Sequence, residues 1–275
     1  MGRRLLSILN FSLFILNSFC ASAQKPGPIG IAFYDVDRLY DTIPSLFYND
    51  ADYTPLGRLK WTASRYDRKI RNTAAVIDSM ALPVVALWGV ENEQVVRDIA
   101  AACRGDYSYL HRTLNTLDGM DFALLYYGDA FYPIRDETGR RYLYIEGELR
   151  RDTVGIVLCA DTRMAEWVVR DLREERPHAK LIVLGRTGRL DPAAWGLSNA
   201  TARAEHAGRG TVRRAQRWEM RDRIFVDTAL RAMGGDVFAR RYLIDPKTGN
   251  PLTTYSRGVY RGGYSYSLPA FVYIR

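Results

Sequence analysis

Cysteine and histidine are scarce in this chain, which has three of each among 275 residues. Cys103 and Cys159 stand at no spacing typical of a zinc or redox motif, so the pattern excludes both kinds of site. An exported location would permit a disulfide between them. The sequence leaves that pairing open, and we expect two buried free thiols.

A long hydrophobic run is also missing. The most apolar stretch, residues 5–19, is interrupted by Asn10 and Asn17. A helix that spans a bilayer needs about 20 apolar residues. We therefore expect no transmembrane segment once this stretch has been removed.

The same stretch has the pattern of a signal peptide. Two arginines precede it, and the small residues Ala21-Ser22-Ala23 follow it as a cleavage site. The sequence therefore predicts a signal peptide at 1–23, a linker at 24–28 and an exported protein, periplasmic or secreted. A lipid anchor through Cys20 is the alternative, but bulky Phe19 precedes it.

Acidic residues are too few to balance the basic ones. Lys and Arg number 39 against 31 Asp and Glu, and losing two arginines with residues 1–23 lowers the net charge from +8 to +6. A basic protein attracts anionic partners, but solvated surface arginines give the same composition. Residues 201–223 concentrate arginines, and we expect an exposed strand pair there, with an anion-contacting face as the alternative.

Internal repeats and low-complexity tracts are absent, so we expect one globular domain at 29–275. Apolar runs alternate with amphipathic segments, which is typical of α/β packing. Ile70, Ala74 and Ile77 share one helical face, and Trp167 and Leu172 are expected to point inward. Strands are predicted at 29–34, 84–88, 122–126, 142–149, 153–159, 180–184 and 224–226, and helices at 61–80, 91–103 and 163–175.

Several stretches follow one another in a familiar order. The most specific reads Phe-Tyr-Asp-Val-Asp-Arg-Leu-Tyr-Asp-Thr, and the chain closes on Gly-Gly-Tyr-Ser-Tyr-Ser-Leu-Pro. Together they resemble the secreted bacterial branch of the endonuclease/exonuclease/phosphatase family. The resemblance implies a DNase I-like four-layer α/β sandwich and magnesium-dependent phosphoester hydrolysis. It rests on residues 33–42, 84–92, 117–126, 156–163, 182–188, 208–222 and 262–269.

The chain departs from the family at the positions that carry the chemistry. Gly89 stands where the family has its main metal-binding Glu, and Asp35 replaces an Asn that positions metal and phosphate. Cys159 replaces a His that contacts the phosphate, and a thiol is a weak donor. Arg186 and Gly188 replace the Asp proposed as base and the Asn that orients the phosphate.

The closing motif departs as well, since Tyr266 and Ser267 replace the catalytic Asp-His pair. Asp222 keeps its place in the framework, although Arg221 and Arg223 flank it where the family has Leu and Gln. The framework is retained while the catalytic groups are substituted. The degenerate site positions are thus Asp35, Gly89, Cys159, Arg186, Gly188, Asp222, Tyr266 and Ser267.

These departures favour a catalytically inactive protein that uses no metal cofactor, although the family would use magnesium. Arg186 cannot accept a proton and would repel a cation, but its guanidinium could bind an anion such as a phosphate in a bidentate manner. The partner is otherwise unknown, and an anionic ligand or a protein fits equally.

Two alternatives remain open. One is an active magnesium-dependent phosphoesterase or nuclease with relocated ligands, although no histidine lies in the catalytic motifs. Its candidate ligands are Asp35, Glu91, Asp118, Asp121 and Asp222. The other is a surface protein-interaction module whose contact face is made by Tyr255, Tyr260, Tyr264 and Tyr266.

Overall fold

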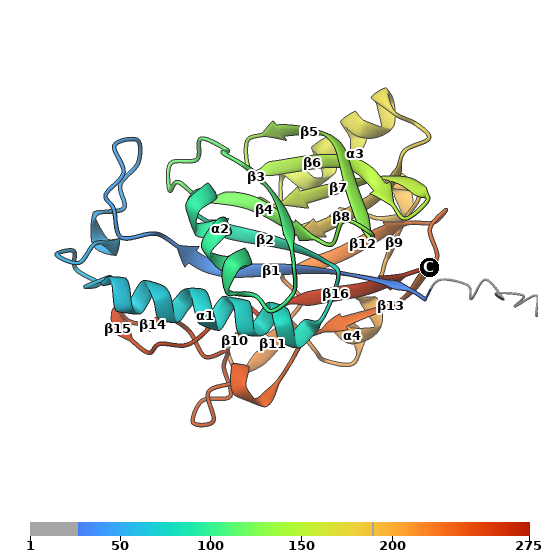
Figure 1. Cartoon of the computed structure of the whole chain (residues 1–275). Coiled ribbons are helices and arrows are strands. Elements are labelled where there is room, and N and C mark those ends of the chain that lie inside the picture. The colour runs from blue at the N-terminus through green and yellow to red at the C-terminus, as the bar shows by residue number, and fades with distance from the viewer. Residues whose placement is uncertain (1–26, 189) are drawn as a thin grey trace, which may run out of the picture.

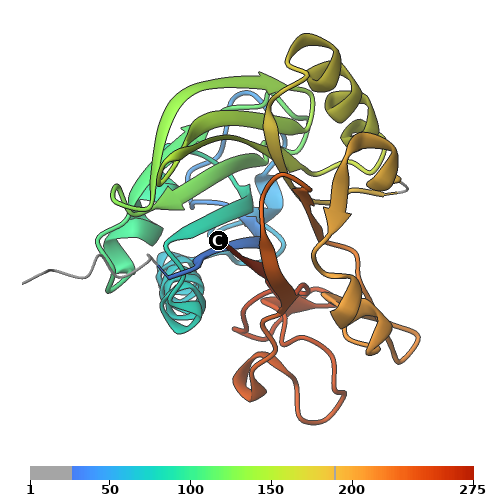
Figure 2. The same cartoon turned by 90° about the vertical axis from the view of Figure 1, so that its right-hand side faces the viewer.

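The computed structural model describes residues 27–188 and 190–275. Two six-stranded sheets pack face to face, and helices cover their outer faces (Figures 1 and 2). The layers are therefore helix, sheet, sheet and helix, as predicted. The signal peptide, Cys20 and most of the linker lie outside the described residues, so export and lipid anchoring stay predictions.

The first sheet has the strand order β13-β16-β1-β2-β4-β3. Strands β1 and β2 are parallel neighbours, and the remaining pairs in this sheet are antiparallel. The bounds are β1 Ile29–Leu39, β2 Val84–Val90, β3 Ser108–Arg112, β4 Asp121–Tyr126, β13 Ala232–Val237 and β16 Ala270–Ile274.

The second sheet has the order β5-β6-β7-β8-β12-β9, with β7 and β8 parallel. Two short hairpins, β10-β11 and β14-β15, lie outside both sheets. The bounds are β5 Phe131–Gly139, β6 Tyr142–Leu149, β7 Asp152–Cys159, β8 Lys180–Gly185, β9 Leu197–Asn199, β12 Arg223–Asp227, β10 Val212–Arg214, β11 Arg217–Glu219, β14 Tyr255–Ser256 and β15 Val259–Tyr260.

Strands buried on both faces explain the continuous apolar runs of the sequence. In β1, Ile31 and Phe33 enter the core between the sheets, whereas Ala32 and Tyr34 face the outer helices. Helices α1 and α2 pack on the first sheet, and α3 packs on the second. The helices are α1 Ala63–Met80, α2 Glu93–Ala102, α3 Met164–Glu175 and α4 Ala202–His206, with short 3-10 turns at Ala51–Tyr53, Ala193–Trp195 and Arg241–Leu243.

Most predicted elements are present within a few residues, and the strand predicted at 142–149 has those bounds. Ile70, Ala74 and Ile77 are buried as expected, and so is Leu172. The inward position of Trp167 is wrong, because it is 42% exposed. The buried stripe of α3 is Ala165, Val168, Val169 and Leu172, and Trp167 lies beside it, with its ring centroid 6.2 Å from that of Tyr142.

The arginine-rich segment at 201–223 is only partly the exposed strand pair that was predicted. Strands β10 and β11 do form a hairpin with largely exposed arginines. The segment also begins with α4, and its last arginines are not solvated. Arg221 and Arg223 carry side chains that are 13% and 23% exposed, each paired with a carboxylate.

The two cysteines of the described part are free, with Cys159 buried and Cys103 partly so. Both thiols are therefore free, as expected, and the alternative bridge is not formed, but the expected burial holds only for Cys159. Within residues 27–188 and 190–275, no helix has the length and apolar character needed to cross a membrane.

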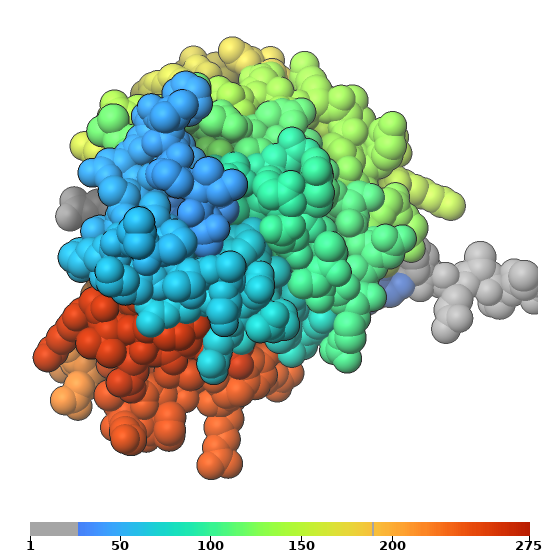
Figure 3. All heavy atoms as spheres, turned by 60° about the vertical axis from the view of Figure 1, so that its left-hand side comes forward, coloured from blue at the N-terminus to red at the C-terminus, as the bar shows by residue number. Residues whose placement is uncertain are grey.

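The carboxyl ends of β1 and β2 are distorted side by side. Asp37 and Arg38 have positive φ angles of 60° and 54°, and the β1–β2 register shifts between Asp35 and Leu39. Gly89 has φ 89°, and the β2–β4 register shifts beside it. Side chains in this conformation cost energy, so such sites mark local constraint. The connection from β1 to α1 projects at this end (Figures 1 and 3).

Candidate functional site

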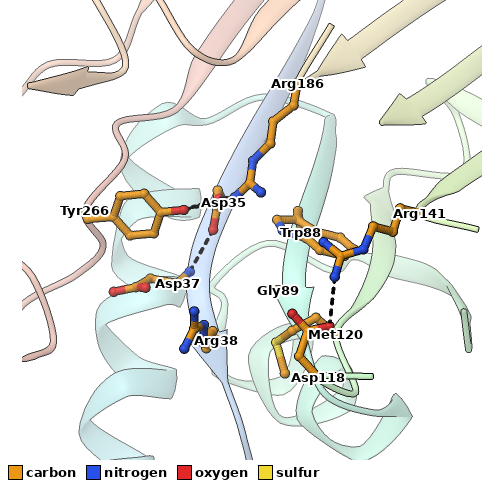
Figure 4. Close-up of a pocket in the computed structure, with 10 residues that line it drawn as sticks. All are labelled: Asp35, Asp37, Arg38, Trp88, Gly89, Asp118, Met120, Arg141, Arg186 and Tyr266. Carbon is orange, nitrogen blue, oxygen red and sulfur yellow. Dashed lines mark hydrogen bonds and ion pairs between the residues drawn. The ribbon is translucent and has the colours of Figure 1, made fainter. Parts of the chain in front are cut away.

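A cavity of about 250 Å³ lies at the distorted ends of β1 and β2 (Figure 4). Strands β1 and β2 supply its floor, and loops from both sheets complete it. Its walls therefore join segments far apart in the sequence. The lining residues are Asp35, Asp37, Arg38, Trp88, Gly89, Asp118, Met120, Arg141, Arg186 and Tyr266.

Asp35 is the centre of this site and is buried. Its Oδ2 accepts hydrogen bonds from Nη2 of Arg186 at 2.8 Å, Nη2 of Arg221 at 2.8 Å and Oη of Tyr266 at 3.1 Å. Its Oδ1 accepts the backbone N–H of Asp37 at 3.0 Å. Both carboxylate oxygens are therefore occupied by donors from the protein itself.

Opposing effects act on the pKa of Asp35. Burial by itself raises it, but the positive charges of Arg221 and Arg186 and the Asp37 N–H together outweigh burial and hold the pKa below its usual range. Asp35 is thus a paired carboxylate. A charged carboxylate with two guanidinium partners has little attraction left for a cation.

Arg221 links the two framework carboxylates. Its Nε and Nη2 donate to Oδ1 and Oδ2 of Asp222 at 3.0 and 2.7 Å, and the same Nη2 reaches Asp35. The guanidinium lies 4.6 Å from the ring centre of Tyr266. Burial works against its charge, yet Asp222 and Asp35 raise the pKa of Arg221, so it stays protonated. We name Asp35, Arg186, Arg221, Asp222 and Tyr266 the ion-pair cluster.

Ser267 completes the attachment behind the cavity. Its Oγ donates to Oδ2 of Asp222 at 2.7 Å, and it is buried rather than exposed to the cavity. Two residues earlier, Oγ of Ser265 donates to the backbone oxygen of Asp35 at 2.6 Å. The closing segment is therefore fixed against β1 and the ion-pair cluster by direct hydrogen bonds.

The residues present do not fit a magnesium ion. Magnesium prefers an octahedral set of oxygen ligands. Here the buried carboxylate of Asp35 is held by guanidinium groups, and Gly89 offers no side chain. A Cβ at Gly89 would lie 3.6 Å from Oδ1 of Asp35, so this position faces the same spot.

Two of the other carboxylates proposed as relocated ligands, Glu91 and Asp121, are directed away from the cavity. Glu91 accepts from the backbone N–H of Asp41 at 2.6 Å and from Tyr48 Oη at 2.9 Å. Asp121 is 3.0 Å from Nε2 of His111. Asp118 does line the cavity. Within the described ranges, no three residues of His, Cys, Asp or Glu gather as a metal site.

Comparisons with known proteins bear on this geometry. Residues 30–158 match the model of the Endonuclease/Exonuclease/phosphatase family. An endonuclease/exonuclease/phosphatase family protein from Bacteroides thetaiotaomicron has a similar structure, with a TM-score of 0.58 at 12% identity, covering 91% of this chain and 98% of that one. The chain resembles this family. The fold is DNase I-like, as predicted.

Two further structures show the range of this fold. The mannosyl-6-phosphatase of B. thetaiotaomicron has a TM-score of 0.57 at 13% identity, covering 90% of this chain and 99% of that one. D. rerio TDP2 in complex with a single strand DNA product has a TM-score of 0.55 at 14% identity, covering 91% and 100%. At these identities the likeness concerns the fold alone. The comparison with curated proteins finds no match.

The structure brings together most of the positions at which the chain departs from the family. Gly89, Arg186 and Tyr266 line the cavity with Asp35, and Ser267 lies directly behind it on Asp222. These substitutions therefore share one site.

Two of the predicted site residues are not part of the cavity. The side chain of Cys159 packs with α3 in the outer core, and burial raises the pKa of its thiol to about 12. Gly188 lies against Thr162, where an added Cβ would be 2.4 Å from the backbone oxygen. Strand alternation explains the first case, because Leu158 takes the face between the sheets.

Sequence reasoning missed several residues of the site. Arg221 was recognised in the sequence only as a substitution beside Asp222, although an arginine next to a carboxylate could have suggested an ion pair. Asp37 and Arg38 belong to the motif at 33–42, but the motif assigns them no role, and Arg141 in the β5–β6 turn belongs to no motif. Burial raises the pKa of Asp37.

The tyrosines of the proposed interaction face are largely packed. Tyr255 and Tyr260 face one another across β14 and β15 with ring centroids 5.4 Å apart. Tyr264 lies at the same centroid distance from Tyr242, and Tyr266 belongs to the cavity. They therefore do not form one exposed surface.

Proposed function

We propose that this protein is an exported, non-hydrolysing protein with the fold of the endonuclease/exonuclease/phosphatase family. One observation carries the proposal: Arg186 and Arg221 both donate to Oδ2 of Asp35 at 2.8 Å. Two guanidinium groups are thus paired with this carboxylate, whereas metal catalysis would require a carboxylate that is free to bind the metal ion. A guanidinium also cannot act as a general base at physiological pH.

The cavity still suits a small anionic ligand. It contains Arg38, which has no carboxylate within 4.0 Å in the described part of the chain, and Arg141, which is 3.6 Å from Oδ1 of Asp118. Arg186 is already engaged, with Nη1 donating to Ala160 and Nη2 to Asp35 and Tyr266. We therefore propose that Arg38 and Arg141 make the first contacts with a phosphate or similar anion, with Arg186 behind them.

The hydrolytic part is tested with the chain from residue 24, assayed with magnesium or manganese on a mannosyl phosphate, single-stranded DNA and a generic phosphodiester. The expected result is no turnover above buffer, and no heat of magnesium binding by calorimetry. Turnover that stops on chelation and in Asp35→Asn, but persists in the exposed control Asp129→Asn, would overturn the proposal.

The binding part is tested by titrating inorganic phosphate and a sugar phosphate into the same protein. Loss of a charged hydrogen bond weakens binding by about tenfold or more, so we expect Arg141→Gln to lower the affinity by that factor. Arg217→Gln, an exposed arginine on β11, is the matched control. If neither anion binds, or if Arg141→Gln and Arg217→Gln lose affinity equally, the assignment of Arg141 to anion binding is contradicted.

Export is tested separately. The chain of residues 1–275 and a variant that lacks residues 1–23 are expressed in a bacterial host, and the cell fractions are compared. We expect the longer chain to leave the cytoplasm and the shortened one to stay there. Equal distribution of the two would refute the signal peptide.

A further inference from the structure

Four large apolar side chains stand almost free of the protein beside the cavity. Leu46 and Phe47 are 95% and 94% exposed, Leu117 is 89% exposed, and Ile43 is also exposed. We name Ile43, Leu46, Phe47 and Leu117 the apolar rim. Large apolar side chains gathered on one exposed surface are a feature of sites that bind proteins, membranes or ligands.

The loop that carries most of the rim is held in place rather than loose. Tyr48 donates to Glu91 at 2.9 Å, and its ring lies against Gly119, where an added Cβ would be 2.4 Å from it. The backbone N–H groups of Ile43 and Ser45 donate to Asp41 and Asp50 at 2.6 and 3.0 Å. The carboxylates of Asp41 and Asp50 therefore accept hydrogen bonds from within the loop, whereas the apolar side chains of the rim are exposed to solvent.

The apolar rim and the cavity share one edge of the molecule. Leu117 is next to Asp118, which lines the cavity and lies 3.6 Å from Arg141. Tyr48, next to Phe47, packs on Gly119 in the same segment. Figure 3 shows the loop rising along this side of the surface. The apolar rim therefore borders the cavity, on the same edge as Asp118 and Arg141.

Further arginines lie beyond the cavity. A neighbouring hollow of about 480 Å³ is lined by Arg140, Arg141, Asp161, Arg163 and Met164, so it holds three guanidinium groups and one carboxylate. Within the described residues, Arg140 has no ion pair, and Arg163 has only Asp161, at 3.4 Å. We name Arg38, Arg140, Arg141 and Arg163 the arginine rim.

We propose that this edge docks on the surface of an anionic phospholipid bilayer. The apolar rim would enter the boundary between headgroups and acyl chains, and the arginine rim would contact headgroup phosphates. Projecting tips suit a lipid surface, whereas the core of a protein interface is a patch that packs against a matching shape. Docking would point the cavity at the headgroups, and it does not depend on whether the cavity hydrolyses anything.

The test is co-sedimentation of the chain from residue 24 with vesicles of phosphatidylglycerol and phosphatidylcholine, and with phosphatidylcholine alone. We expect binding to the anionic vesicles that weakens with salt. Burial of two large apolar side chains corresponds to about a 100-fold change in partition, so Leu46→Asn/Phe47→Asn should lose binding by that order. Arg140→Gln/Arg163→Gln should lose about fivefold per arginine.

Met233→Asn is the matched control, since Met233 is exposed on β13 at the opposite end of the molecule (Figure 1). As a second readout, Phe47→Trp should shift its emission to shorter wavelength with anionic vesicles. Titration of inorganic phosphate separates a free anion from a bilayer, because Leu46→Asn/Phe47→Asn should leave it unchanged. The proposal is overturned if the protein does not sediment with anionic vesicles, if Phe47→Trp shows no emission shift, or if Leu46→Asn/Phe47→Asn binds vesicles as well as the wild type. These are also the results expected if the apolar rim binds a protein instead of a bilayer.

Discussion

Arg221 donates one Nη2 group to both Asp35 and Asp222, at 2.8 and 2.7 Å, although Asp35 lies 186 residues earlier in the chain. This contact connects the first strand with the segment before β12 through a nearly buried guanidinium. Together with Arg186 it gives the two carboxylates two fixed positive partners. The cluster is therefore a structural element, and three of its members, Asp35, Arg186 and Tyr266, also line the cavity.

Replacing Arg221 with Met should destabilise the protein strongly. Removal of one partner from a buried ion pair leaves an uncompensated charge and costs about 3–5 kcal/mol. Denaturant unfolding at neutral pH measures the loss. Arg217→Met, on the exposed hairpin nearby, should change stability by less than about 0.5 kcal/mol. Adding Asp35→Asn to Arg221→Met should recover part of the loss, and equal effects of the two arginine variants would contradict the role of the cluster.

Glu91 should make stability depend on pH. Burial raises its pKa to about 7 in the folded protein, although the Asp41 N–H and Tyr48 act in the opposite direction. Its ordinary pKa is 4.5. Its contribution to stability is thus fully present below pH 4.5 and is lost as the pH rises through 7, on the order of 2–3 kcal/mol.

Glu91→Gln removes this dependence while it keeps the shape of the side chain. Urea unfolding midpoints of the wild type should fall relative to the variant between these pH values. The exposed Glu93→Gln, two residues away, should instead give a curve parallel to the wild type. If both variants track the wild type, burial of the Glu91 carboxylate does not govern this range.

Gly89→Ala should destabilise the protein through its backbone. The positive φ of 89° costs an L-residue roughly 1–2 kcal/mol, and the new Cβ would lie 3.2 Å from the backbone nitrogen of Arg38. Gly196 also has a positive φ, 67°, but a Cβ added there would have no atom within 4 Å. Gly128 has neither a positive φ nor a close neighbour of an added Cβ. Thermal unfolding should therefore rank the losses as Gly89, Gly196 and Gly128, and a different order would show that this bulge is not constrained.

Cys159 should be inert to alkylation in the native protein. Burial raises the pKa of its thiol to about 12, so almost no thiolate is present at pH 8. Iodoacetamide followed by mass spectrometry should label it only after unfolding. Rapid labelling of the native protein would reopen a nucleophilic role for this residue.

Local patterns fixed much of the fold in advance. The strand at 142–149 and the helical face of Ile70, Ala74 and Ile77 follow from apolar periodicity, which depends only on neighbours in the chain. The substitutions at Gly89, Arg186 and Tyr266 also predicted a single altered site, because each stands in a motif that the family brings together. The positions do meet in one cavity.

Other features of the structure could not be predicted from residues that are adjacent in the sequence. The direction of Cys159 depended on a strand alternation that places Leu158 between the sheets, and the exposure of Trp167 depended on where α3 rests on its sheet. The bulge at Asp37 and Arg38 has no sequence signature, since neither residue is a glycine.

The sequence by itself thus determined the α/β framework and predicted substitutions at the family's catalytic positions, because side-chain chemistry and periodicity are properties of the chain. Only the tertiary structure decided what replaced those groups. Arg221 reaches Asp35 because two sheets bring their strand ends together, and the apolar rim is a surface because nothing in the described residues covers it. Such contacts depend on distances in space that spacing along the chain does not encode.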